Sequence, residues 1–105
     1  MPFTDDQALD LYIQAVHFEA KASTCSAQLP QMAVPLRDAY AAWQAANSAA
    51  LQQGETVASL RGMRGPQPPS IIHMAHMQAQ LLNTLPLDDL QRRCNEVLVG
   101  VRLPK

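Results

Sequence analysis

The chain is predicted to be an all-α protein, a bundle of four helices. Apolar residues recur with the period of an α-helix along most of its 105 residues, and no stretch alternates apolar and polar residues as a half-exposed strand does. Capping residues and prolines divide this pattern into four segments. Four amphipathic helices in a chain of this length favour a bundle, and the length is that of one domain, 1–105.

The first helix is expected over residues 5–22. Thr4 and Gln7 have the spacing of a capping box, and two aspartates follow Thr4 in the first turn, where negative charge interacts favourably with the helix dipole. The polar run 23–26 is expected to end the helix.

The second helix is expected over residues 35–53. Pro35 is tolerated in a first turn, because no backbone donor is needed there. Gly54 is expected to supply a left-handed cap at the other end. Residues 54–70 contain three of the four glycines and three of the eight prolines, so we expect a long connection here, which can include one helical turn at residues 56–61.

The last two helices are expected over residues 71–84 and 88–101. Ser70 is a good N-cap for the third helix, and Pro86 follows its end. Asp88 is expected to cap the fourth helix.

The first helix is apolar on two nearly opposite sides. One stripe contains Leu9, Tyr12, Ile13, Val16 and Ala20, and the other contains Leu11, Ala15, Phe18 and Ala22. Such a helix either is central in the fold or presents one side to a partner. Two interpretations follow: the 54–70 connection covers the second stripe, or Leu11 and Phe18 contact a partner protein or a second copy of the chain, as a homodimer.

The two cysteines predict a disulfide between Cys25, in the polar loop after the first helix, and Cys94, on the apolar face of the last. No C-x-x-C spacing or metal-ligand grouping surrounds either residue. The bridge would close a loop of about 70 residues, worth about 4.5 kcal/mol by chain entropy. It indicates an oxidising compartment, hence a periplasmic or secreted protein whose signal peptide has been removed. The alternative is a pair of reduced, buried thiols in a cytoplasmic protein.

Composition excludes several classes of protein. With 48% apolar and 16% charged residues the chain is globular rather than disordered. No apolar run approaches the length of a membrane span. Bases are not clustered on one helix or interleaved with aromatic residues, so we expect no nucleic-acid partner. Catalytic motifs are lacking and the hydroxyl residues fall in caps and loops, so we expect no enzyme.

One cluster has ligand-like residues at helical spacing. His73, His76 and Met77 lie at positions i, i+3 and i+4, and imidazole with thioether suits copper better than zinc. Met63 is the candidate for a fourth ligand. The alternative is that these are two solvated histidines beside an exposed methionine.

Arg61 and Arg64 lie in the glycine-rich part of the long connection. A flexible loop with two arginines can bind an acidic partner, although it can equally be a solubilising linker. Together these patterns predict a small exported, non-enzymatic protein that binds another protein, of the inhibitor or immunity type, with an exported enzyme or toxin as its partner. The second functional hypothesis is a periplasmic copper-binding protein.

Overall fold

The computed structural model describes residues 3–67 and 70–102. These ranges contain five α-helices, two short 3-10 helices and no strand. The elements are α1 (Asp5–Gln28), η1 (Pro30–Met32), α2 (Ala33–Ala46), α3 (Ser48–Leu60), α4 (Ile71–Gln80), η2 (Leu81–Thr84) and α5 (Leu87–Val101). The all-α prediction is confirmed, but the expected number of helices, four, is wrong.

The start of α1 is as predicted and its end is not. The Thr4 hydroxyl accepts from the Gln7 amide at 3.1 Å, and the Gln7 side chain accepts from the Thr4 amide at 3.0 Å. The helix then runs through the polar residues that were expected to end it at residue 22. Their hydroxyls do not interrupt it, since Thr24 donates to the carbonyl of Ala20 within the helix. Cys25 is therefore helical rather than in a loop.

The expected 35–53 helix is broken at Asn47. Its side-chain amide donates to the carbonyl of Trp43 at 2.8 Å, and its backbone departs from helical geometry at φ −118°, ψ 17°. Asparagine side chains compete in this way for backbone groups and so favour helix ends. The chain turns here from α2 into α3.

Gly54 is buried inside α3 and does not cap a helix, so the predicted 54–70 loop is wrong over residues 54–60, which belong to α3. A Cβ atom at this position would overlap the carbonyl of Ala8 and lie 2.7 Å from the Cβ of Tyr12. The glycine therefore allows α3 to pack tightly on α1. Gly62, with φ +70°, takes the left-handed conformation just after α3 ends.

The C-terminal half is close to expectation. Ser70 caps α4, its hydroxyl accepting from the His73 amide at 3.1 Å, and η2 continues the helix to Thr84. The last helix starts one residue early, at Leu87. Its N-cap is Pro86, and the predicted cap Asp88 lies in the first turn.

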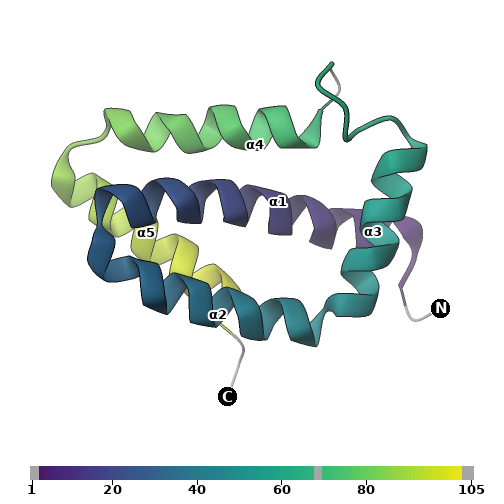
Figure 1. Ribbon diagram of the computed structural model, residues 1–105, viewed down its shortest axis with the longest axis horizontal. Helices are drawn as coiled ribbons and strands as arrows, with labels where there is room; N and C mark the ends of the chain where they lie inside the picture. The colour runs from purple at the N-terminus through teal and green to yellow at the C-terminus, as the bar shows by residue number, and fades with distance from the viewer. Residues whose placement is uncertain (1–2, 68–69, 103–105) are drawn as a thin grey trace.

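The molecule is flat, with extents of 41 × 37 × 16 Å. Figure 1 shows α4, α1 and α2 side by side, with α3 across one end and α5 behind α1 and α2. Helix axes pack about 8–10 Å apart, so a thickness of 16 Å holds two helix layers. Among the described residues, the second layer contains α5 alone, and no helix covers the opposite face of α1.

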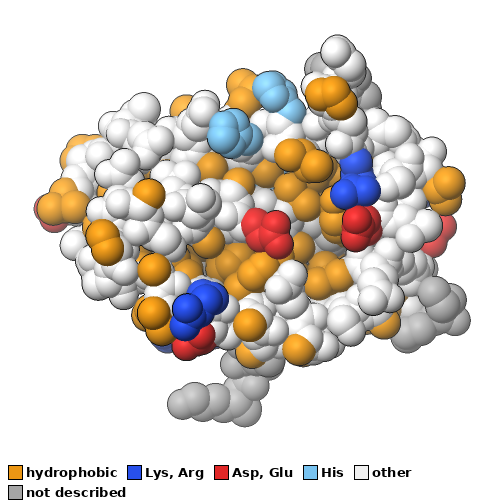
Figure 2. Space-filling model, in the orientation of Figure 1, with side chains coloured by type: hydrophobic (Ala, Val, Ile, Leu, Met, Phe, Trp, Pro, Cys, Tyr) orange, Lys and Arg blue, Asp and Glu red, His pale blue; other side chains and the backbone are white. Residues whose placement is uncertain are grey.

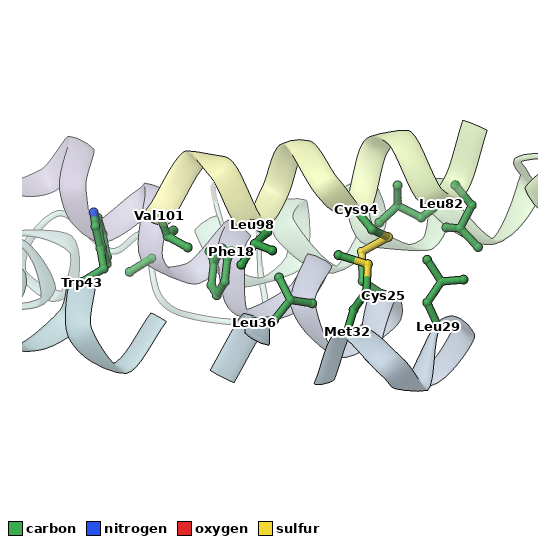
Figure 3. Close-up of a cluster of buried hydrophobic side chains, with 12 residues drawn as sticks. Phe18, Cys25, Leu29, Met32, Leu36, Trp43, Leu82, Cys94, Leu98 and Val101 are labelled. Carbon is green, nitrogen blue, oxygen red and sulfur yellow. A yellow bond between two sulfur atoms is a disulfide. The ribbon is translucent and has the colours of Figure 1, made fainter. Parts of the chain in front are cut away.

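Both apolar stripes of α1 nevertheless contribute to cores, so α1 is central. The main core lies between α1, α2 and α5, as Figure 3 shows. The smaller core joins Leu9 and Tyr12 of α1 to α3 and to Ile71.

Phe18 and Leu11 belong to the main core. Phe18 is 6% exposed and stacks on Tyr40, and Leu11 is half-buried against the same cluster. Phe18 therefore has little surface left for a partner, because α2 and α5, rather than the loop, cover its stripe.

Cys25 and Cys94 form the predicted disulfide, which joins α1 to α5 (Figure 3). Their Cα atoms are 5.8 Å apart and both residues are fully buried. A buried disulfide of this kind is compatible with an oxidising, exported location. No helix in the described ranges combines the length and the apolar character needed to cross a membrane.

Candidate functional site

The uncovered face of α1 forms the floor of a hollow of about 580 Å³, which we call the front groove. Figure 2 shows apolar side chains gathered in the middle of this face, with charged and histidine side chains around them. The floor consists of Tyr12, Ala15, Val16, Glu19 and Ala20. The walls come from α2 (Tyr40, Gln44), α3 (Leu51, Gln52, Glu55), α4 (Ile72, Ala75, His76) and Arg64.

The floor follows directly from helical spacing. Its five residues stand at i, i+3, i+4, i+7 and i+8, which is one continuous stripe along α1. The floor overlaps mainly the first apolar stripe predicted from the sequence, with Tyr12, Val16 and Ala20, and it reaches the second stripe at Ala15. Two of its members are alanines, and Ala75 of α4 faces the same space. Small side chains are what leave the surface hollow here.

Glu19 is fixed at the edge of the groove by Tyr40. The tyrosine hydroxyl donates to Glu19 Oε1 at 2.8 Å and lies 3.4 Å from the carbonyl of Ala15. Burial, and then the hydrogen bond and charge of Glu19, raise the pKa of Tyr40 well above its usual range. Within the described ranges no basic side chain pairs with Glu19.

Arg64 is held at the opposite edge by three groups. Its Nε donates to the hydroxyl of Tyr12 at 2.9 Å, and its terminal nitrogens reach Ser59 and Glu55, each at 3.2 Å. The hydrogen bond with Tyr12 is the main cause of its raised pKa. Arg61, the other arginine of the predicted flexible loop, pairs with Asp6 of α1 at 3.1 Å. Both arginines are thus engaged within the chain.

The histidines and methionine predicted to bind copper are separated. His76 lines the front groove, and its Nε2 lies 3.1 Å from the side-chain nitrogen of Gln80. His73 lines a different hollow, and Met77 is half-exposed on α4. The predicted His73, His76 and Met77 set is therefore not brought into one pocket.

The hollow that contains His73 also contains Met63, the predicted fourth ligand, together with His17 and Met74. We call this space, of about 370 Å³, the methionine hollow. Sequence reasoning missed His17, because it lies on another helix, far away in the chain. Desolvation, assisted by the charge of Lys21, lowers the pKa of His17. No group of three or more His, Cys, Asp or Glu side chains in the described ranges is placed to hold a metal.

Comparison of this chain with protein-family models, curated proteins and solved structures found no match. What the groove binds has to follow from its own shape and charge.

Proposed function

We propose that this protein is a small non-enzymatic binding module that receives an amphipathic helix of a partner protein in the front groove. The observation that carries the proposal is the open stripe of α1 between α2 and α4, from Tyr12 to Ala20. Amphipathic helices bind to other proteins in apolar grooves of this kind through side chains spaced by three and four residues.

The length and depth of the groove suit one short helix. From Tyr12 to Ala20 the floor spans eight residue steps, about 12 Å at the rise of an α-helix, which is a little over two turns. Ala15 and Ala20 on the floor are small and leave room for large apolar side chains of the occupant. Val16 on the floor and Ile72 on the α4 wall supply further apolar contact area.

The charges of the groove define the chemistry of the occupant. Arg64 forms a salt bridge with Glu55, whereas Glu19 accepts a hydrogen bond from Tyr40 and forms no salt bridge in the described ranges. A lysine or arginine on the bound helix would meet Glu19, and an acidic residue there would be repelled. The partner segment is therefore a helix with one apolar face, and it carries a lysine or arginine that meets Glu19.

The disulfide supports an exported location, in the periplasm or outside the cell, since such bonds persist in oxidising compartments. The partner would then be another exported protein, such as an enzyme or toxin, that is held or inhibited through the bound helix.

The test is a selection from a displayed library of helical peptides, followed by affinity measurements with the selected peptides. The variant Ala20→Phe places a large side chain on the floor of the front groove. The variant Glu19→Lys replaces the acidic residue of the groove with a basic one. Asp38→Lys is the matched control, an exposed acid-to-base change on α2 outside the groove. We expect apolar peptides with a lysine or arginine to be selected, and both groove variants to lose at least about tenfold in affinity, or about 1.4 kcal/mol. The control is expected to keep wild-type affinity.

Selection of acidic peptides, or equal affinity for all three variants, would contradict the proposal. Self-association of the wild type that Ala20→Phe abolishes would contradict it as well, since a second copy of the chain would then occupy the groove.

A further inference from the structure

We propose that the methionine hollow is a binding site for the soft monovalent ion Cu(I), with His17, Met63, His73 and Met74 as its ligands. The site is separate from the front groove and does not depend on the function proposed for it. It also differs from the ligand set expected from the sequence, since His76 and Met77 have no part in it.

Three segments of the chain bring these side chains to one space. His17 comes from α1, Met63 from the connection after α3, and His73 and Met74 from the first turn of α4. The hollow that they line depends on tertiary packing, because Met63 and Ile13 border the small core between α1 and α3.

Backbone hydrogen bonds hold two of these segments together. The amide of Met63 donates to the carbonyl of Ala58 at 2.9 Å, and its carbonyl accepts from the amide of Ile71 at 2.8 Å. Met63 is thereby fixed beside the N-terminus of α4, where Ser70 caps the amide of His73. Two candidate ligands, Met63 and His73, are thus carried by a braced part of the backbone.

The donor set selects the metal. Imidazole nitrogen and thioether sulfur are both neutral, and thioether is a soft ligand that favours Cu(I) over Zn(II), Mg(II) or Ca(II). The rest of the lining is Ile13, Ile71 and Ser70, with no carboxylate to attract a hard divalent ion. A singly charged ion also carries a smaller desolvation cost than a divalent one in an apolar hollow. Met74 is 51% exposed and gives the ion access from solvent.

The test measures Cu(I) affinity by competition with a chromophoric Cu(I) chelator, without oxygen. Thiol reductants are avoided and the disulfide is verified by intact mass, because free thiols of Cys25 and Cys94 would themselves bind Cu(I). The ligand variants are Met63→Leu, Met74→Leu and His73→Ala, the first two keeping the side-chain volume. The matched controls, His76→Ala and Met77→Leu, make the same changes on α4 outside the hollow.

We expect one Cu(I) per chain, a loss of at least about tenfold in affinity for each ligand variant, and no change for the controls. Met74 is half-exposed in the wild type, so we expect Met74→Leu to fold. This variant keeps the test valid if Met63→Leu fails to fold. The proposal is overturned if the wild type binds no tighter than about 1 mM, if the controls lose as much affinity as the ligand variants, or if Zn(II) binds equally well.

Discussion

The hydroxyl of Tyr40 on α2 donates a 2.8 Å hydrogen bond to the carboxylate of Glu19 on α1. The same tyrosine ring stacks on Phe18, with centroids 4.5 Å apart, and on Trp43, with centroids 5.9 Å apart. One residue thus links the aromatic row of the main core to the acid at the edge of the front groove. Core packing thereby positions the charge that we propose to recognise a partner.

Tyr40 is predicted to make the protein less stable at alkaline pH. Its pKa is raised on folding, so its contribution to stability is complete below the usual tyrosine pKa of about 10. As the pH rises further, the unfolded chain ionises first and the free energy of unfolding falls. Urea unfolding of wild type and Tyr40→Phe from about pH 8 to 11 measures this, because all other groups are shared. Equal losses in the two proteins over this range would contradict the prediction.

Gly54→Ala is predicted to destabilise the protein, although alanine is the better helix former. The added Cβ would overlap Ala8 and crowd Tyr12, so α1 and α3 must move apart, at a cost of about 1–3 kcal/mol. Gly100→Ala in α5 is the matched control, because nothing lies within 4 Å of a Cβ there. We expect the control to gain up to about 1 kcal/mol in helix propensity. If chemical denaturation shows that both variants are stabilised, the close contact between α1 and α3 is wrong.

Removing the disulfide is predicted to lower the free energy of unfolding by about 2–5 kcal/mol, because the bond closes a long loop in the unfolded chain. The variant is Cys25→Ala/Cys94→Ala, compared with the oxidised wild type by chemical denaturation. Intact mass after alkylation should show no reactive thiol in the air-purified wild type. Two alkylated cysteines would refute the disulfide, and with it the argument for an exported protein.

The starts of α1 and α4 could be predicted from the sequence because their signals are local. The capping box of Thr4 with Gln7, and Ser70 before α4, each depend on residues three apart. The helix break at Asn47 and the packing role of Gly54 were not predicted, because the first depends on a competing side-chain contact and the second on a distant one. A glycine after a helical pattern predicts a helix cap. Only the position of Ala8 in the folded protein shows that Gly54 is where α3 packs closely on α1.

The candidate sites were less predictable than the fold. The two apolar stripes of α1 were visible in the sequence, but which side stays uncovered depends on α5 lying alone in the second layer. The methionine hollow joins His17 to Met63 and His73, and no spacing within one helix indicates that pairing. The hydrogen bond of Arg64 could not be predicted from the sequence either, because its partner Tyr12 belongs to the first helix.

The most direct test of the front groove is a methyl NMR titration of alanine-labelled protein with a peptide selected by display. We predict that the methyl signals of Ala15 and Ala20, on the floor of the groove, shift as the peptide is added. The signals of Ala41 and Ala42, exposed on α2 outside the groove, should stay in place. Shifts confined to Ala41 and Ala42, with the groove alanines unmoved, would contradict the claim that the open stripe of α1 is the binding surface.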